Sequence, residues 1–379
     1  MMFCHLLMSS AATTISPTGR ALGTSGAIVG AGLMSGPVLG GLLLDTFGWR
    51  AIFWPQLPVS AAGALLAWRL LREQRPAVAE RRIDLPGAVL LFAALASFVL
   101  AINRGGDWGW LSARILGLAL LSLGALAALL RVERRSRSPI IDLNLFRNRL
   151  FAAATLSLLF FFSATAGVTL LMPFYLTRVR HYDALRAGSA LIAVPVVMLV
   201  FSPLTGWLTD RYGSRLLATG GMGMVVVALA SLLTLDQRTP MAAVMARLAL
   251  LGVGNALFQS PNSSTIMGAA PRTHLGAAAA MNATGRSIGQ AMGFALAGAI
   301  FVDRAAAQAG IAAGDRLRVE RLPGGALLSG IQAALVAALV IAFAGMGAAF
   351  IRGGARQGAA DGEEDERRAE PRPALALGE

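Results

Sequence analysis

The sequence predicts an all-α polytopic membrane protein, and three observations support this class. Of the 379 residues, 56% are hydrophobic and 14% are charged, whereas roughly one-quarter of the residues of a soluble domain are charged. The mean hydropathy of the chain is +0.64. Ten apolar blocks follow one another along the chain, each close to the length of about 20 residues that a helix needs to cross a bilayer.

Each block is expected to form one spanning helix, and an apolar start at about 1–15 looks like a further, shortened helix. The blocks cover about 22–44, 52–71, 85–102, 115–130, 151–175, 187–208, 216–235, 240–266, 275–302 and 326–351. The tail at about 352–379 is polar and mixes charges of both signs, so we expect it to be disordered and cytoplasmic.

The net charge of +13 comes from 33 basic residues, all of them arginine. The arginines lie mainly between the apolar blocks, which is the distribution of the positive-inside rule, and this argues against nucleic-acid binding. The strongly basic connectors at 69–82 and 131–149 are therefore predicted to be cytoplasmic. Alternation of the helices then places the following loops outside: 45–50, 103–114, 176–186, 236–239 and 303–325.

Enzymatic and metal-binding classes find little support in the residues. Cys4 is the single cysteine, which excludes an intrachain disulfide and a multi-cysteine metal site. The three histidines, His5, His181 and His274, have no metal-ligand spacing. We find no nucleophile–base pair and no phosphate-binding loop, so the sequence predicts no enzymatic activity, no cofactor and no metal.

The first full block, "GAIVGAGLMSGPVLGGLLL", allows two interpretations. Gly30, Gly32 and Gly36 have a nucleotide-like spacing, but a nucleotide-binding loop lies between a strand and a helix of a soluble unit. A membrane helix fits the continuous apolar run better. Gly32, Gly36 and Gly40 recur every four residues on one face, and small residues at this spacing let membrane helices approach closely. Pro37 removes a backbone donor and bends the helix.

The same block carries a resemblance to a known family. "GAGLMSGPVLGG" resembles the G-x-x-x-G-P-x-x-G-G antiporter motif of major facilitator transporters. The following "GWRAIFWPQLPV" resembles the start of the sixth helix of the 14-helix drug:proton antiporters (EmrB/QacA type), with glutamine in place of the usual asparagine. The residues at the antiporter-motif positions are Gly32, Gly36, Pro37, Gly40 and Gly41.

Three further matches follow in the family's order, so that the resemblance covers about residues 16–351. "GWLTDRYGSR" resembles the G-x-L-x-D-R-x-G-R-R loop motif between two helices. "IDLPGAVLL" and "SPIIDLNLFRNRLFAAA" resemble the connectors around two central helices. "GAAAAMNATGRSIGQAMGFALAG" resembles the penultimate helix.

The resemblance implies a major facilitator fold lacking the first three helices and part of the fourth. It implies four regions: a remnant of the N-terminal bundle (1–71), two central linker helices with basic connectors (72–149), a C-terminal six-helix bundle (150–351) and the disordered cytoplasmic tail (352–379). The family's proton-coupling residues lie in the helices without a counterpart here. No Asp or Glu lies deep within an apolar block of this sequence.

The function implied by the resemblance is multidrug efflux by alternating access. A multi-pass protein of the bacterial cytoplasmic (inner) membrane would export lipophilic or cationic small molecules in exchange for protons. Its partners would be the small-molecule substrate, protons and the lipid bilayer, with a periplasmic adaptor protein as a further candidate. Two alternatives stay open: a truncated, non-transporting remnant, and an exporter of a specific metabolite or lipid.

The loop motif supplies candidate gating residues. In the family this loop pairs charges with neighbouring helix ends and gates alternating access, and an acid or an arginine at a helix terminus has a physical reason to do so. The alternative is a basic anchor that only sets topology. The candidate gating residues are Gly206, Asp210, Arg211, Gly213 and Arg215.

Polar residues inside the later blocks are candidates for a substrate cavity, because ionisable side chains within membrane helices are costly and usually functional. The alternative is interhelical hydrogen bonding without substrate contact. The candidate cavity residues are Arg247, Asn255, Gln259, Asn262, Asn282, Arg286 and Gln290. Six apolar side chains could add a wall for lipophilic drugs, although most are expected to pack or face lipid: Phe160, Phe161, Phe162, Met172, Phe174 and Tyr175.

Overall fold

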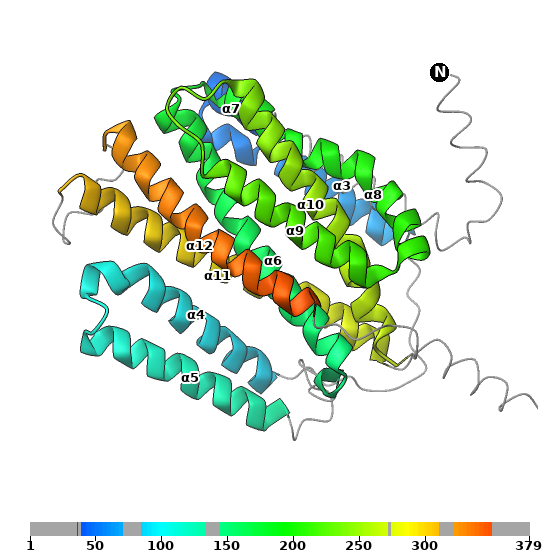
Figure 1. Cartoon of the computed structure of the whole chain (residues 1–379). Coiled ribbons are helices and arrows are strands. Elements are labelled where there is room, and N and C mark those ends of the chain that lie inside the picture. The colour runs from blue at the N-terminus through cyan, green and yellow to red at the C-terminus, as the bar shows by residue number, and fades with distance from the viewer. Residues whose placement is uncertain are drawn as a thin grey trace, which may run out of the picture.

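The computed structural model describes residues 36, 39–70, 85–133, 145–271, 274–310 and 322–350, which form helices joined by short turns (Figure 1). No strand occurs in these described ranges, and the all-α prediction is confirmed. Gly32 and Pro37, the connectors at 71–84 and 134–144, and the tail at 352–379 lie outside the described residues.

The described helices follow the predicted apolar blocks from 52–71 onward, and the block at 187–208 is divided into two helices. A short helix at 39–47 precedes them. In chain order the elements are η1 (Trp49–Phe53), α3 (Gln56–Leu70), α4 (Leu85–Trp108), α5 (Ala113–Glu133), η2 (Leu145–Arg147), α6 (Arg149–Phe174), η3 (Tyr175–Val179), α7 (Ala184–Leu191), α8 (Ala193–Tyr212), α9 (Ser214–Leu232), α10 (Met241–Gly268), α11 (Leu275–Gln308) and α12 (Gly324–Phe350).

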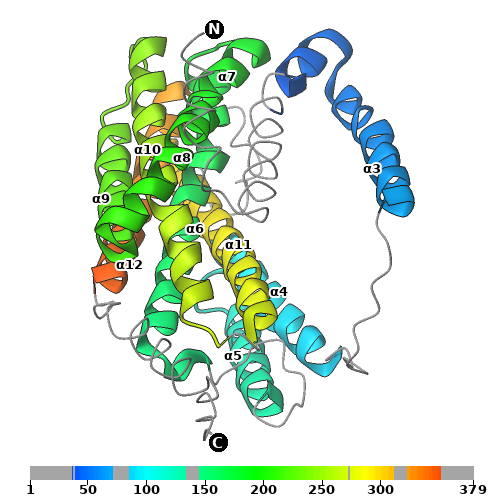
Figure 2. The same cartoon turned by 90° about the vertical axis from the view of Figure 1, so that its right-hand side faces the viewer.

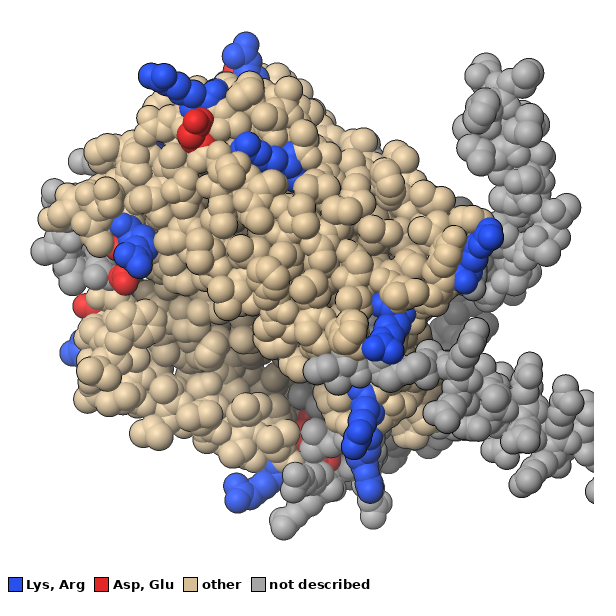
Figure 3. All heavy atoms as spheres, viewed as in Figure 1, with Lys and Arg blue, Asp and Glu red and all other residues tan. Residues whose placement is uncertain are grey.

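Seven of the described helical segments are long and apolar enough to cross a membrane, judged by length and composition: α4, α5, α6 with η3, α7 with α8, α9, α10 and α12. α11 is longer than any of them but is less apolar, because it carries Asn282, Arg286 and Gln290 among many small residues. Figure 3 shows charged side chains at the rims of one face and a broad uncharged band between them. This arrangement supports the predicted polytopic architecture.

α6 is the central helix of the bundle. It contacts α10, α11 and α12, while α9 packs against α10 and α12, and α8 packs against α10. Residues 161–168 of α6 are all buried, which covers every face of the helix. A helix that is apolar on all sides is expected in such a position.

The bundle has two ends, which we name by one residue each. At the Asp236 end, the amide nitrogen of Gln332 near the start of α12 donates to the Leu235 carbonyl in the α9–α10 turn at 3.2 Å. At the Arg215 end, Arg215 at the start of α9 donates to the Phe350 carbonyl at the end of α12 at 2.9 Å. The α9–α10 turn and the start of α12 therefore lie at one end, and the α8–α9 turn and the end of α12 at the other, as the predicted alternation of the helices requires. Which end faces the cytoplasm stays a prediction.

α4 and α5 form a hairpin beside the bundle, and α4 packs against α11 (Figure 1). Ser122 of α5 donates to the Ala94 carbonyl of α4 at 2.9 Å. α5 otherwise exposes apolar side chains, as a lipid-facing helix does: Leu116, Leu120, Leu121, Leu123 and Leu126. α3 is exposed along its length and stands apart from the bundle in Figure 2.

Two boundaries differ from the expectations. α11 continues to Gln308, so the first residues of the loop expected at 303–325 are helical. The block at 187–208 is interrupted at Ile192, where α7 ends, and α8 begins at Ala193. Pro195 lies in the first turn of α8, where a missing backbone donor is tolerated, and this favours a helix start at that point.

Candidate functional site

A stripe of glycines on α11 sets the distance between α11 and α6. Gly285, Gly289 and Gly293 recur every four residues, and a Cβ atom at Gly289 would lie 2.6 Å from the Leu159 carbonyl oxygen. A Cβ atom at Gly293 would overlap the Ser163 carbonyl oxygen. The Ser163 hydroxyl donates to the Gly289 carbonyl at 2.9 Å. The two backbones therefore touch, as small residues at this spacing allow in membrane helices.

The predicted polar face of α11 lies beside this stripe, because Arg286 and Gln290 each follow a stripe glycine by one position, or about 100° around the helix. Arg286 and Gln290 are exposed and Asn282 is half-buried. The Asn282 amide nitrogen lies 3.2 Å from the Ser263 hydroxyl oxygen of α10. This contact joins Asn282 of the predicted α11 face to Ser263, the residue that follows Asn262 on α10.

A row of aromatic rings continues from Arg286 into the bundle. The Arg286 guanidinium lies 5.1 Å from the ring centroid of Phe162 on α6. Phe162 meets Phe161 edge to face at 5.1 Å, and Phe161 stacks on Phe258 of α10 at 4.3 Å. A cation over an aromatic face is stabilised within apolar surroundings. These four side chains join α11, α6 and α10 at the site.

The α10 face is more deeply buried than the α11 face. Asn262 is fully buried, Asn255 is 9% exposed and Gln259 is half-buried. The Asn255 amide nitrogen meets the Met198 sulfur of α8 at 3.9 Å. The amide oxygens of Asn255 and Asn282 are buried without a hydrogen-bond partner among the described residues. A buried oxygen of this kind normally has a water or ligand donor, so these two atoms are the natural contact points of the face.

Arg247 stands apart from the other candidate cavity residues. It lies near the start of α10, eight residues or about 12 Å along the helix from Asn255. One terminal guanidinium nitrogen of Arg247 is buried without a hydrogen-bond partner in the described part of the chain. The structure therefore separates Arg247, toward the Asp236 end, from the face that Asn282 and Ser263 connect.

Most of the six side chains proposed for the apolar wall pack inside the bundle. Phe161, Met172 and Tyr175 are 0–1% exposed, and Phe162 is 6% exposed. Phe174 is exposed at the surface. The expectation that most of these side chains pack or face lipid is confirmed.

The predicted gating loop is a one-residue junction between α8 and α9. Gly213 has a φ of +82°, a conformation that glycine adopts without strain. Arg215 follows it, donates to the Phe350 carbonyl at the end of α12, and lies 5.3 Å from the Phe350 ring. A cation at a helix C-terminus is stabilised by the carbonyl groups and the helix dipole.

The other loop residues are placed differently. Arg211 lies 5.6 Å from the ring centroid of Trp207, one turn back on α8. Gly206 has open space around it. The Asp210 side chain lies outside the described part of the structure.

The glycine-rich helix makes its close approach at a different residue than expected. At Gly36 or Gly40 an added Cβ atom would meet none of the described residues within 4 Å. Gly41 is buried, and a Cβ atom there would lie 2.6 Å from the Ala184 carbonyl oxygen of α7. Among the described residues the close contact is therefore at Gly41, one position or about 100° from Gly40, and the predicted face of Gly32, Gly36 and Gly40 stays a prediction.

Asp45 explains which face is used, and its role was missed from the sequence. Its carboxylate accepts hydrogen bonds from the backbone nitrogens of Leu185 at 2.9 Å and Ala184 at 3.3 Å. These are the first residues of α7, where a negative charge is stabilised by the helix dipole. The signal in the sequence is the spacing of four between Gly41 and Asp45, which places both on one helix face.

A second missed feature is the α9–α10 turn at the Asp236 end. Thr239 donates its hydroxyl to the Asp236 carboxylate at 2.8 Å, and the Arg238 backbone nitrogen donates to it at 2.7 Å. These hydrogen bonds, that of Thr239 first, hold the pKa of the Asp236 carboxyl below its usual range. The Tyr175 hydroxyl donates to the Asp236 carbonyl at 2.7 Å and so ties the turn to the end of α6. An aspartate followed by a nearby threonine is typical of such turns.

Two hollows lie away from the candidate cavity residues. One lies between α11 and α12, and the other lies between α4 and α11, where Asp107 and Asp303 are among the lining residues. Within the described ranges, no group of three or more His, Cys, Asp or Glu side chains is arranged to hold a metal ion.

Long apolar helices with buried amides and glycine-mediated contacts define the class: a multi-pass helical membrane protein. The family model described as Major Facilitator Superfamily matches residues 4–294, and the chain belongs to this family.

Several characterised members are similar to the chain. The multidrug resistance protein Stp of Mycobacterium tuberculosis is 33% identical over 294 residues, which are 78% of this chain and 54% of that protein. The riboflavin transporter RibZ of Clostridioides difficile is 30% identical over 283 residues, or 75% of this chain and 61% of RibZ. The tetracenomycin C resistance and export protein of Streptomyces glaucescens is 28% identical over 284 residues, or 75% of this chain and 53% of that protein. The chain thus spans between half and two-thirds of the length of these relatives.

Proposed function

We propose that the chain acts as a secondary active transporter of the multidrug efflux type, related to the 14-helix drug:proton antiporters. It would export lipophilic or cationic small molecules across the bacterial cytoplasmic membrane in exchange for protons, by alternating access. The observation that carries the proposal is the polar side chains of α10 and α11, with Asn282 beside Ser263 and two buried amide oxygens that have no hydrogen-bond partner among the described residues. Membership of the family and the names of Stp and the tetracenomycin C exporter support it.

The chemistry of this face narrows the substrate class. The candidate cavity residues are amides and arginines, and none is acidic. Amides and guanidinium groups donate hydrogen bonds. The Phe161 and Phe258 rings are buried in the core behind this face, and Phe162 lies against the Arg286 guanidinium. A lipophilic molecule with carbonyl or hydroxyl groups fits these residues directly. A cationic drug would need a carboxylate from elsewhere in the protein.

The Arg215 contact is the proposed gate at its end of the bundle. Arg215 joins the start of α9 to the end of α12 through one charge-assisted hydrogen bond. Alternating access requires contacts at the two ends of the bundle to form and break in turn. In this proposal the Arg215 contact is present in one state and lost in the other.

Dye transport into everted membrane vesicles tests the proposal. Vesicles containing the chain should accumulate ethidium or the neutral dye Nile red when respiration supplies a proton gradient, and a protonophore should abolish the accumulation. Arg286→Gln should reduce transport about tenfold, because one charge-assisted contact with substrate or ring is lost. Arg238→Gln, in the exposed α9–α10 turn, is the matched control and should transport normally. Accumulation equal to that of empty vesicles would contradict the proposal and favour the non-transporting alternative.

Export of one specific metabolite is a second candidate, favoured by the similarity to the riboflavin transporter RibZ. The same vesicles separate the two candidates. A multidrug transporter should accumulate both dyes, with each dye competing against the other. A metabolite transporter should accumulate riboflavin or a related compound and exclude both dyes.

A further inference from the structure

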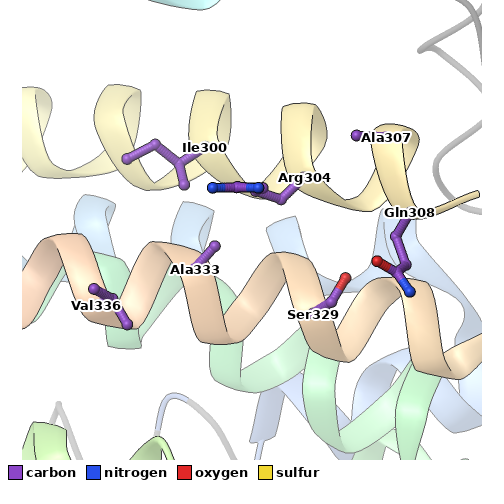
Figure 4. Close-up of a pocket in the computed structure, with 7 residues that line it drawn as sticks. All are labelled: Ile300, Arg304, Ala307, Gln308, Ser329, Ala333 and Val336. Atoms are coloured by element: carbon purple, nitrogen blue, oxygen red, sulfur yellow. The ribbon is translucent and has the colours of Figure 1, made fainter.

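A groove between the end of α11 and the start of α12 has the features of a lipid site. Its volume is about 490 Å³, and it lies at the Asp236 end of the bundle. Figure 4 shows the residues that line it. Its lining residues are Ile300, Arg304, Ala307, Gln308, Ser329, Ala333 and Val336. The sequence suggested no site here, because Arg304 was expected to lie in a loop.

Arg304 is the one charged residue among the seven described residues that line the groove. The Arg304 side chain lies between the two helices (Figure 4) and is exposed, and it has no hydrogen-bond or ion-pair partner among the described residues. Its neighbour Asp303 lines the other hollow, between α4 and α11. Gln308 adds a side-chain amide one turn further along α11, while the Ser329 hydroxyl already donates to the Ala326 carbonyl. No acidic residue is among the seven that line the groove.

Polarity changes along the groove in the direction that a lipid requires. Arg304 lies four residues, or about 6 Å, before the end of α11. α12 has 27 residues and is about 40 Å long, which exceeds the hydrocarbon thickness of about 30 Å, so the helix ends reach the headgroup region. Ile300, Ala333 and Val336 lie deeper along their helices than Arg304 and Ser329. The groove is thus polar at headgroup depth and apolar below it.

We propose that this groove binds an anionic glycerophospholipid. The phosphate accepts hydrogen bonds from the Arg304 guanidinium and the Gln308 amide, and an acyl chain lies along Ile300, Ala333 and Val336. A planar guanidinium binds phosphate oxygens in a bidentate manner. A net anionic headgroup is favoured over a zwitterionic one, because the described lining residues include one positive charge and no acid to pair with a choline group. This proposal is independent of the transport activity proposed above.

Native mass spectrometry of the full chain released from detergent tests the site. The chain is titrated with phosphatidylglycerol, phosphatidylcholine or inorganic phosphate. We expect phosphatidylglycerol to bind at least several-fold more tightly than phosphatidylcholine, and inorganic phosphate not to compete. Arg304→Ala should weaken phosphatidylglycerol binding about tenfold, which is the usual scale for a charge-assisted hydrogen bond. Arg238→Ala, exposed at the same end of the bundle and outside the groove, removes the same charge and should bind normally.

A second variant fills the apolar half and keeps the charge. Ala333→Phe should also weaken phosphatidylglycerol binding, and it keeps the proposal testable if Arg304→Ala does not fold. The proposal is overturned if Arg304→Ala and Arg238→Ala bind equally, if inorganic phosphate displaces the lipid, or if a groove-filling phenylalanine leaves lipid binding unchanged.

Discussion

Two regions of the chain have glycines at every fourth position: the stretch that ends in the helix at 39–47, and helix α11. The glycines of the two regions differ in whether they contact another helix. On α11, Gly289 and Gly293 each touch the backbone of α6, and Gly285 approaches a leucine side chain there. At Gly36 and Gly40, which precede or lie in the earlier helix, an added Cβ atom meets no atom of the described part of the chain within 4 Å. Glycine at every fourth position therefore shows that a close approach is sterically allowed. A partner with a matching surface decides whether it occurs.

The partner surfaces differ in kind. α6 offers α11 a helix backbone and the Ser163 hydroxyl, which donates to the Gly289 carbonyl. α7 offers the earlier helix only its first turn, which is held by the Asp45 carboxylate. A hydrogen bond inside a long helix pair fixes a whole face, whereas a charge at a helix terminus fixes one point. This difference explains why the contact at Gly41 is local and lies off the predicted face.

The largest expected effect is that of Gly289→Ala. The added methyl group would lie 2.6 Å from the Leu159 carbonyl oxygen, so the helices must separate, and we expect the free energy of unfolding to fall by about 2–3 kcal/mol. Gly298→Ala on the same helix is the matched control, since its nearest neighbour is a leucine methyl at 3.8 Å. Thermal unfolding in detergent measures both. Equal melting temperatures would show that α11 does not pack on α6 as described.

A smaller effect is expected for Gly41→Ala. Its methyl group would lie 2.6 Å from the Ala184 carbonyl oxygen, but α7 is short and its end can shift, so we expect about 1–2 kcal/mol.

The control for this change is Gly40→Ala, which meets open space and should be neutral or slightly stabilising, because alanine favours the helix. If Gly40→Ala destabilises the protein more than Gly41→Ala, the originally expected face is the correct one.

Removing the charge at the helix terminus should have a weaker effect again. Asp45→Ala removes two hydrogen bonds and a favourable charge–dipole interaction with α7, and we expect a loss of about 0.5–1 kcal/mol. Asp45→Asn keeps an acceptor oxygen without the charge and should lose about half as much. Hydrogen exchange at residues 184–187 is the measurement. Unchanged exchange in both variants would remove Asp45 as the reason for the contact at Gly41.

The smallest effect on stability is expected for Asp236→Asn, and its pH dependence tests whether the α9–α10 turn is held by charge or by shape. Because the folded pKa of Asp236 is lowered, its carboxylate stabilises the turn above its unfolded pKa, and this stabilisation is lost as the pH falls through the folded pKa. The melting temperature of Asp236→Asn should lie slightly below that of the unmodified chain at neutral pH, and the gap should close below pH about 4.

The difference in melting temperature between Gly289→Ala and the unmodified chain does not depend on a titrating group, so it should be constant over the same pH range. A gap for Asp236→Asn that does not narrow at all as the pH falls below about 4, the usual pKa of an unfolded aspartate, would show that the turn is held by its shape and not by the carboxylate.

The sequence placed the described helices from 52 onward, apart from the break at Ile192 and the end of α11, because each apolar block is a local property of the chain. The four-residue spacing also placed Asn282, Arg286 and Gln290 on one face of α11 correctly. The contact of that face with Ser263 could not be predicted, since it depends on how two helices cross. Arg247 shows the same limit: its depth in a block was correct, but the structure separates it from the α10–α11 polar face.

The features missed from the sequence all join residues far apart in the chain. Asp45 and the start of α7 are separated by about 140 residues, and nothing local in either segment identifies the other. Arg215 and Phe350 are separated by 135 residues, and only the family resemblance gave a reason to expect a helix end near this loop. The position of Arg304 in the groove could not be predicted, because the apolar pattern ends α11 too early and places Arg304 in a loop.

The α4–α5 hairpin has one further consequence. α5 packs mainly on α4, and α4 is joined to the bundle mainly through α11. We therefore expect a rotation of α11 to displace α5 as well, because α4 lies between them. A fluorophore attached at the exposed Leu120 would report that displacement by energy transfer to a second dye on α9. Motion of α11 can thus be followed in single molecules without labelling the polar face itself.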